Sequence, residues 1–178
     1  MPSTTTTLHG PFNPPSTIMT KLKTSPHPIL TWYHKYVTDF TTSKTTTPAT
    51  KYYASTATLT NPDNSIISGA QQIWDYYIEM YGRFERCGYE VISVMAVTDT
   101  DTDEGKREEK HTLIVECTTS LYLKGGGAGR KVSLPQAFVY EIGNAEEGEG
   151  KGEDGLQIWR LRVYFDKGLL MKAAGMEE

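Results

Sequence analysis

The sequence predicts an α+β fold, with helices in its first half and a meander of strands in its second half. Apolar residues recur at helical spacing in two segments before residue 88. From residue 89 onward they alternate with polar residues, which is typical of half-buried strands. The connections between these later segments are polar or glycine-rich, as antiparallel hairpins require. Helices first and strands afterwards is the order of an α+β domain.

Length and composition favour one soluble domain. The chain has 178 residues, 38% hydrophobic and 22% charged, which is enough for a core without metal or disulfide support. A net charge of -4 argues against a nucleic-acid surface, and no apolar run is long enough to span a membrane. With only Cys87 and Cys117 present, we expect a reduced cytoplasmic protein; a single disulfide is the alternative.

The first 24 residues form a threonine- and proline-rich segment with few clustered apolar side chains. Such a segment buries too little surface to offset its ordering entropy, so a disordered tail is expected. Its lack of acidic residues resembles a transit peptide weakly, although it contains no arginine. The expected organisation is therefore a tail over 1–24, an α+β domain over 25–173 and a short C-terminal tail over 174–178.

The first helix is expected to begin at Ser25-Pro26, a capping residue followed by proline at the first helical position. One apolar stripe then follows at helical spacing: Ile29, Tyr33, Tyr36, Val37 and Phe40. A threonine-rich break ends this helix. A short helix restarts at Pro48 and ends near Tyr53.

The middle of the chain, residues 52–69, predicts a strand, a turn and the start of a second long helix. Ala57, Leu59 and Asn61 fall on one face of that strand, and a turn follows at Pro62. Ser68 is expected to cap the helix, and Cys87-Gly88 to end it. Its apolar face would comprise Ile73, Tyr77, Met80, Tyr81 and Phe84.

Four strands are predicted after this helix, over 90–98, 111–123, 131–142 and 156–166. In the second strand, the side chains expected to face the core are Val115, Cys117, Thr119 and Leu121. In the last strand they are Trp159, Leu161, Val163 and Phe165. Arg160, Arg162 and Tyr164 alternate with these and are expected on the outer face.

Two segments resemble ligand-binding motifs without fulfilling them. The run from Asp99 to Asp103 begins like a calcium loop, but Glu104 stands where the loop needs glycine and Lys110 where it needs glutamate. The glycine-rich stretch 125–129 precedes a strand instead of a helix, so it is interpreted as a turn. The four histidines have no ligand spacing. We therefore expect no metal and no cofactor.

The order of elements, the stretch 54–62 followed by Ser68-Gly69, and the final segment 158–166 resemble the nuclear-transport-factor-2-like superfamily. That superfamily includes ketosteroid isomerase, limonene epoxide hydrolase, scytalone dehydratase and the SnoaL-like polyketide cyclases. The resemblance covers roughly residues 26–172. It implies a cone-shaped fold, a cystatin-like roll in which a curved antiparallel or mixed sheet wraps around the N-terminal helices.

The resemblance also implies site residues. Asn61 matches the position of the isomerases' general base and of a water-positioning asparagine in the epoxide hydrolases. Tyr36 approximately matches the oxyanion tyrosine of the isomerases, and Gln136 falls near the second oxyanion donor of the isomerases. Val163 stands where the epoxide hydrolases keep a catalytic aspartate, and Thr119 replaces a larger or charged pocket residue. Neither mechanism is therefore complete.

An amide has no useful basicity at neutral pH, so Asn61 cannot act as a proton-abstracting base. Tyr36, Asn61 and Gln136 could instead hold a carbonyl or enolate oxygen. The alternatives are that Asn61 only caps the turn and that Tyr36 is a core tyrosine. The rest of the predicted pocket is mostly apolar: Tyr33, Leu59, Val115, Cys117, Thr119, Leu121, Phe138, Trp159, Leu161, Val163 and Phe165.

Two functions follow as hypotheses. The first is a SnoaL-like pocket protein for an apolar, carbonyl-bearing, polyketide- or terpenoid-like metabolite, acting without cofactor as an isomerase, dehydratase or cyclase if it is an enzyme. The second is a non-catalytic ligand-binding or dimerisation module. The resemblance implies a homodimer formed through the sheet, with the face of Arg160, Arg162 and Tyr164 partly covered by the second copy.

Overall fold

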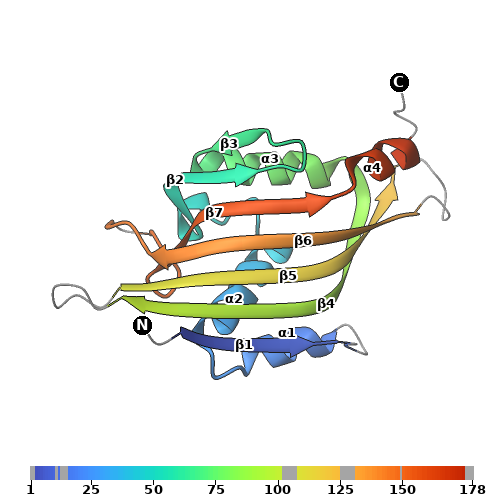
Figure 1. Ribbon diagram of the computed structural model, residues 1–178. Helices are drawn as coiled ribbons and strands as arrows, with labels where there is room; N and C mark the ends of the chain where they lie inside the picture. The colour runs from blue at the N-terminus through green and yellow to red at the C-terminus, as the bar shows by residue number, and fades with distance from the viewer. Residues whose placement is uncertain are drawn as a thin grey trace.

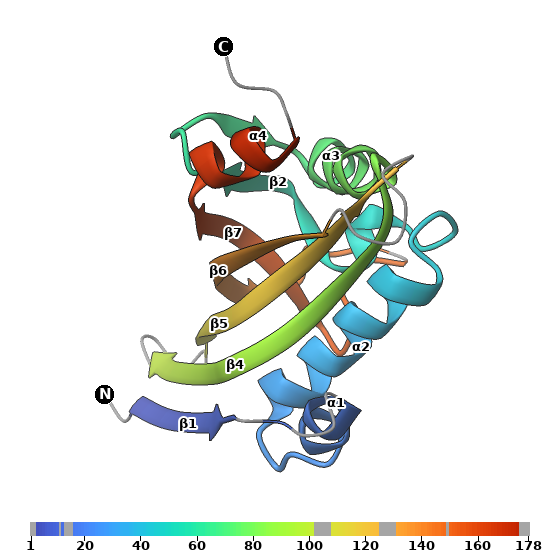
Figure 2. The same ribbon diagram turned by 90° about the vertical axis from the view of Figure 1, so that its right-hand side faces the viewer.

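The computed structural model describes residues 3–10, 12, 16–101, 108–124, 131–148 and 150–174. It contains one curved seven-stranded sheet that wraps around helices, as Figures 1 and 2 show. The strands are β1 (Ser3–His9), β2 (Tyr53–Thr60), β3 (Ile66–Ser68), β4 (Phe84–Asp101), β5 (Glu108–Leu123), β6 (Lys131–Asn144) and β7 (Leu156–Phe165). The helices are α1 (Ser16–Lys23), α2 (Pro28–Thr42), the 3-10 helix η1 (Ala49–Lys51), α3 (Ala70–Gly82) and α4 (Lys167–Ala174).

The strand order in the sheet is β1-β4-β5-β6-β7-β2-β3. Neighbouring strands pair in antiparallel fashion, except β2 and β7, which are parallel. Helix α2 crosses the concave side of the sheet, with α1 beside its beginning and α3 near its other end (Figure 2). The predicted α+β class and the curved, mixed sheet are confirmed.

The N-terminal segment differs from the prediction. Residues 3–9 form β1, which pairs with β4 from Ser3 opposite Asp99 to His9 opposite Ser93. Helix α1 follows, and its Ile18 and Leu22 are buried. The expectation of a disordered tail over 1–24 is corrected for these residues: their polarity predicted little burial, but backbone pairing with β4 orders β1, and threonine is a good strand former.

Several element boundaries also differ. Helix α2 begins at Pro28 with His27 as N-cap, and the Ser25 hydroxyl accepts a hydrogen bond from the His27 backbone N–H at 3.1 Å. Ser68 does not cap α3; it ends β3, and Gly69, with φ of 102°, is the N-cap. Helix α3 ends at Gly82, so the predicted helical stretch 84–88 belongs to β4.

The four predicted strands after α3 all exist, and the alternation in β5 is as predicted. Cys117, Thr119 and Leu121 are buried, while Glu116 and Tyr122 lie toward the outer face. In β7 the pattern breaks at Trp159, which is 39% exposed although Ile158 and Leu161 are both buried. The register between β6 and β7 shifts at this point.

This shift explains why Trp159 was assigned to the wrong face. A β-bulge adds one residue to a strand, so the alternation of side chains before and after it is out of phase. Ile158 takes the inward place that the sequence pattern gave to Trp159. From Leu161 onward the predicted facing holds.

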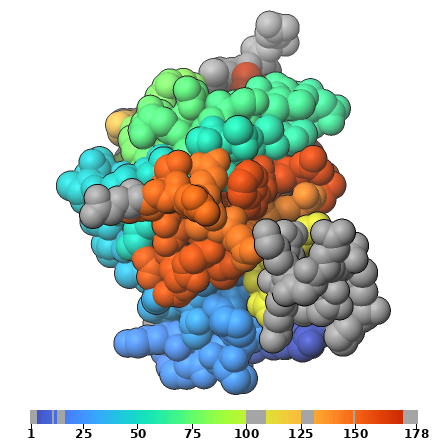
Figure 3. Space-filling view, turned by 90° about the vertical axis from the view of Figure 1, so that its left-hand side faces the viewer, coloured from blue at the N-terminus to red at the C-terminus, as the bar shows by residue number. Residues whose placement is uncertain are grey.

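The connection between β6 and β7 is fixed against the helical layer. Lys35 of α2 binds Glu153 and Asp154 at 2.8 and 2.6 Å, and Lys51 of η1 binds Glu153 at 3.1 Å. The Glu153 backbone N–H donates to the Lys51 carbonyl at 2.8 Å. In Figure 3 this orange segment lies beside the cyan and teal segments. These ion pairs and the backbone hydrogen bond join the β6–β7 connection to α2 and η1.

Candidate functional site

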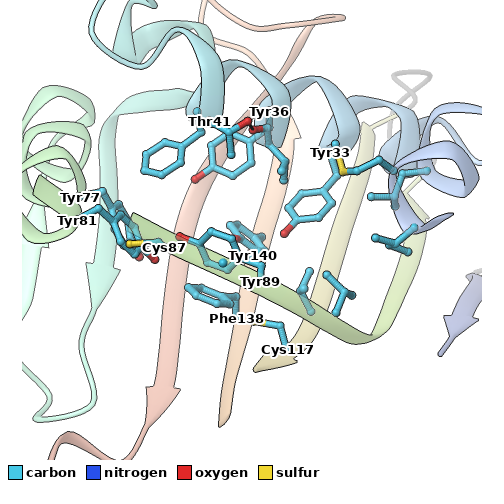
Figure 4. Close-up of a pocket in the computed structure, with 18 residues that line it drawn as sticks. Tyr33, Tyr36, Thr41, Tyr77, Tyr81, Cys87, Tyr89, Cys117, Phe138 and Tyr140 are labelled. Carbon is cyan, nitrogen blue, oxygen red and sulfur yellow. Dashed lines mark hydrogen bonds between the residues drawn. The ribbon is translucent and has the colours of Figure 1, made fainter. Parts of the chain in front are cut away.

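A cavity of about 350 Å³ lies between α2, α3 and the concave face of the sheet (Figure 4). Its lining comprises Ile18, Met19, Leu22, Tyr33, Tyr36, Val37, Phe40, Thr41, Tyr77, Tyr81, Cys87, Gly88, Tyr89, Val91, Val115, Cys117, Phe138 and Tyr140. None of these residues carries an ionised side chain at neutral pH. The cavity is therefore apolar apart from hydroxyl and thiol groups.

The two helices place aromatic rings on the cavity by their periodicity. Tyr33, Tyr36 and Phe40 recur three and four residues apart, so they share the face of α2 that looks at the sheet. Tyr77 and Tyr81 are four residues apart on α3, and their rings stack with centroids 6.0 Å apart. Figure 4 shows these two sets of rings converging from different helices.

The sheet supplies the floor. The floor residues are two positions apart on each strand: Val115 and Cys117 on β5, Phe138 and Tyr140 on β6. Side chains two positions apart share one face of a strand, so both pairs point to the concave side. Val115 lies directly opposite Phe138 in the ladder, and the rings of Phe138 and Tyr140 stack at 6.2 Å. The floor and the helical rings thus enclose the space from opposite sides.

The cavity opens between α2 and β4 and is closed at one end by α1. Thr41 is exposed and Tyr89 is 37% exposed, so these two residues lie on the rim. At the closed end the wall is formed by Ile18, Met19 and Leu22 of α1. A ligand entering at the rim would meet tyrosine side chains before it reached the aliphatic wall.

Two cavity hydroxyls differ in their hydrogen bonding. The Tyr36 hydroxyl lies 2.9 Å from that of Tyr53, a fully buried tyrosine behind the lining, and either oxygen can donate. Tyr77 is only 5% exposed, and among the described residues its hydroxyl has no hydrogen-bond partner. A buried polar group without a partner is uncommon in folded proteins and needs an explanation.

Burial keeps the cavity tyrosines protonated. It raises the pKa of Tyr36 to about 12, despite the opposing effect of the hydrogen bond with Tyr53. Burial also raises the pKa of Tyr33, Tyr77 and Tyr140, and nearby tyrosines add to it. The hydroxyls are therefore neutral hydrogen-bond donors near pH 7. They cannot serve as phenolate bases there.

The cavity thiols are also neutral. Burial raises the pKa of both Cys87 and Cys117, and neither forms a disulfide. A thiol with a raised pKa is a poor nucleophile, since the thiolate is the reactive form. The lining can thus supply shape, apolar contact and neutral donors.

The structure brings some of the predicted site residues to this cavity. Tyr33, Tyr36, Val115, Cys117 and Phe138 line it. Others are buried behind or beside the lining without contributing to it: Leu59, Thr119, Leu161 and Val163. Leu121 and the half-buried Phe165 belong to a smaller apolar cluster near α4, and Trp159 lies outside.

Asn61 is not in the cavity, which corrects the prediction that it shares a site with Tyr36. Strand β2 ends at Thr60, so the alternation that placed Asn61 inward no longer applies. Its side-chain amide donates to the Ser65 hydroxyl at 3.1 Å, and its backbone N–H donates to the Ser65 carbonyl at 2.9 Å. Asn61 therefore stabilises the turn between β2 and β3.

Gln136 also lies outside the lining. Its side-chain carbonyl accepts a hydrogen bond from the Thr119 hydroxyl across the β5–β6 pair. This bond occupies the carbonyl oxygen of Gln136, not the amide NH2 group that would have to donate to a ligand oxygen. Of the three residues proposed as a polar set, only Tyr36 borders the cavity.

Sequence reasoning did not assign Phe40, Tyr77, Tyr81, Tyr89 and Tyr140 to the site. The spacing of Tyr77 and Tyr81 on a helical stripe did predict burial, but periodicity cannot distinguish core from cavity wall.

Among the described residues, no group of three or more His, Cys, Asp or Glu side chains is placed to hold a metal ion. Within the same residues, no helix has the length and apolar character needed to cross a membrane.

No family model matches the sequence, and no curated protein matches it significantly. Solved structures do share the fold. A protein from Shewanella putrefaciens assigned as a SnoaL-like polyketide cyclase aligns with a TM-score of 0.53 and 12% identity over 90% of this chain and 94% of its own. One from a Jannaschia species with the same assignment gives 0.52 and 14%, over 86% and 99%. The structure of a Sac3N peptide bound to Mex67:Mtr2 gives 0.51 and 8%, over 76% and 95%.

Proposed function

We propose that this chain, which has the cone fold of the nuclear-transport-factor-2-like superfamily, binds a neutral, mostly apolar small molecule that carries an oxygen acceptor. One observation carries the proposal. A cavity lined by aromatic and aliphatic side chains contains a buried tyrosine hydroxyl, that of Tyr77, with no partner among the described residues. A ligand carbonyl or ether oxygen would satisfy this donor.

The size of the cavity sets the size of the ligand. At the packing density of protein interiors, about 0.74, a 350 Å³ cavity holds roughly 260 Å³ of ligand. The cavity volume itself lies at the lower end of the usual range of small-molecule sites, about 300–1,000 Å³. The aromatic lining favours flat, conjugated ligands, which stack on tyrosine and phenylalanine rings.

The chemistry available to the lining limits any reaction. Tyr36 and Tyr77 can stabilise an oxyanion or enolate by neutral hydrogen bonds in a water-poor site. The described lining has no carboxylate or histidine to take a proton, so the substrate would have to enolise readily by itself. Cyclisation or isomerisation of a polyketide- or terpenoid-like carbonyl compound fits these terms, and plain binding is the alternative.

Fluorescence titration with three naphthalenes tests the proposal. 2-Acetylnaphthalene carries a carbonyl, 2-ethylnaphthalene has nearly the same shape without the acceptor, and 2-naphthoate is charged. We expect the ketone to bind most tightly and the carboxylate most weakly, because the described lining has neutral donors and no cationic side chain. Equal affinities for the ketone and the hydrocarbon, or tightest binding of the carboxylate, would refute it.

A matched pair of variants locates the donor. Tyr77→Phe should remove the preference for the ketone over the hydrocarbon, a loss of about fivefold for one neutral hydrogen bond. Tyr164→Phe makes the same chemical change on the outer face of β7, where the ring is 51% exposed. This control should leave the preference unchanged.

The outer face of the sheet supports a second role, self-association. Arg160 and Arg162 both pair with Glu141 there, at 3.5 and 2.9 Å, and Trp159 and Tyr164 expose part of their rings beside them. Aromatic and arginine side chains are enriched in interfaces. We expect a homodimer through this face. A monomeric mass in sedimentation equilibrium at micromolar concentration would contradict the dimer. The cytoplasmic location expected from the sequence remains a prediction.

A further inference from the structure

A second group of buried polar side chains lies apart from the cavity, where the α1–α2 junction meets the sheet. His27, the N-cap of α2, is 8% exposed, and His111 at the beginning of β5 is 3% exposed. Thr98 of β4 is directly opposite His111 in the ladder. Its hydroxyl lies 2.8 Å from Nδ1 of His111 and 3.4 Å from Nε2 of His27. One hydroxyl thus connects the two imidazoles.

The hydrogen bonds of this cluster require a neutral ring. A threonine hydroxyl has one proton and can donate it to one imidazole nitrogen while accepting from the other ring. If both imidazoles are protonated, every ring nitrogen becomes a donor, and the Thr98 proton loses its acceptor. Nδ1 of His27 is buried without a partner among the described residues, so a proton there would also be unsatisfied.

The cluster is joined to the wall of the cavity by a short stretch of chain. The Ser25 hydroxyl accepts from the His27 N–H at 3.1 Å, and the Ser25 N–H donates to the Leu22 carbonyl at 3.3 Å. Leu22 is fully buried and lines the cavity. These two bonds place His27 and the end of α1 in one turn, so displacement of His27 would displace Leu22.

The charged neighbours offset only part of the cost of protonating the two buried rings. Glu109 of β5 acts on both rings, with an oxygen 4.0 Å from Nε2 of His111, and favours their charged forms. On β4, Asp99 follows Thr98 and so projects to the opposite face of the sheet. On the helical side, Lys23 of α1 acts on His34 of α2 and disfavours its charge. Among these described side chains, the carboxylate of Glu109 acts on both imidazoles.

We propose that the His27–Thr98–His111 cluster is an acid-sensitive latch, which holds α1 against the cavity while the imidazoles are neutral and releases it when both are protonated. The regulation of ligand entry rests on the function proposed above, whereas the release of α1 does not. In the open state the two rings lie in water and can take up protons. They no longer repel each other, and their N–H groups are no longer buried without hydrogen-bond partners. The N-terminal end of α2, beside His27, adds to the cost of charging this ring in the closed state.

The direction of the pH effect follows from linkage. Burial lowers the pKa of both His27 and His111 below 6.5 in the folded protein. The latch therefore contributes its full stability above pH 6.5 and loses it as the pH falls from 6.5 through the lowered values. At about pH 5.5 a ring in the open state, with an ordinary pKa of about 6.5, is mostly protonated, so each ring whose pKa is lowered by burial shifts the balance toward the open state.

Hydrogen exchange of the intact chain, measured by mass spectrometry without ligand, tests the latch. After correction for intrinsic exchange, amides of residues 16–23 should exchange faster at about pH 5.5 than at about pH 7.5. Peptides from β6 and β7 should change much less. Exchange of α1 that is independent of pH in the wild type would overturn the proposal.

The double variant His27→Gln with His111→Asn keeps polar atoms near the original nitrogens but cannot be protonated. We expect it to remove the pH dependence of α1, while His9→Gln, a change of an exposed histidine on β1, keeps it. A double variant that retains the wild-type acid response would overturn the proposal. If the double variant does not fold, Thr98→Val is the second test. It should weaken the protection of the α1 amides from exchange at neutral pH, and unchanged protection would overturn the proposal.

Ligand kinetics separate the latch from the proposed function. Dissociation of 2-acetylnaphthalene from the wild type should accelerate over the same pH range as α1 exchange. Acid-labile α1 without binding of any naphthalene would contradict only the proposed function. Binding with an acid-stable α1 would contradict only the latch.

Discussion

Tyr77→Phe is expected to make the ligand-free protein more stable. The substitution removes a hydroxyl that is buried and has no partner among the described residues, and it leaves the ring in place. Burying a hydroxyl without a hydrogen bond costs about 1–3 kcal/mol in protein mutational data. Phenylalanine does not have this cost, so the free energy of unfolding should rise by about 1 kcal/mol or more.

The expected shift is large enough to measure. For a chain of 178 residues, 1 kcal/mol corresponds to roughly 2–4 °C in Tm. Urea unfolding followed by tryptophan fluorescence gives the free energy directly, provided that the m-value is unchanged. The same variant should bind 2-acetylnaphthalene about fivefold more weakly, so stability and binding should change in opposite directions.

Tyr53→Phe is the matched control. It removes the same atom from a tyrosine that is also fully buried, but this hydroxyl is bonded to that of Tyr36 at 2.9 Å. Losing the bond leaves Tyr36 unpaired, so the control should destabilise the protein by about 1–3 kcal/mol. If both variants lose stability to the same extent, Tyr77 has a partner in solution and the reasoning from its unsatisfied hydroxyl is refuted.

Four further outcomes are expected. Deleting residues 1–24 should lower the Tm by many degrees, since β1 and α1 pack on the domain; an unchanged melting curve would show that they do not. Leu22→Ala should cost about 2–5 kcal/mol in urea unfolding and enlarge the cavity, so that it accepts larger ketones than the wild type does. Gly69→Ala should cost about 1–3 kcal/mol, because φ of 102° strains any residue with a Cβ; a neutral effect on the urea midpoint would contradict the backbone geometry. For Asp39, burial opposes ionisation, but hydrogen bonds from Lys51 and Tyr52 outweigh it and hold the pKa below 3.8. Its stabilisation is therefore fully present above pH 3.8 and is lost as the pH falls from 3.8 through the lowered pKa, so the cost of Asp39→Asn, about 1 kcal/mol at about pH 7, should shrink as the pH falls below 3.8.

Local periodicity by itself determined the class of the fold and most of the elements. The stripe of Tyr33 and Tyr36 on the first long helix, and the alternation of Val115 and Cys117 on β5, are set by residue spacing along one element. Such spacing survives folding because each element presents one apolar face to a common core. The two helical tyrosines and the two strand residues were therefore assigned to the concave side correctly.

Only the tertiary structure decided where alternation ends and what each face meets. The bulge at Trp159 and the end of β2 before Asn61 each take one side chain out of the predicted alternation, and both depend on pairing with a neighbouring strand. The pairing of β1 uses backbone groups, which are the same in every sequence. Whether Tyr77 is buried in a packed core or on the wall of a cavity depends on how far α2, α3 and the sheet lie from one another. The pattern of residues within any one segment does not determine that separation.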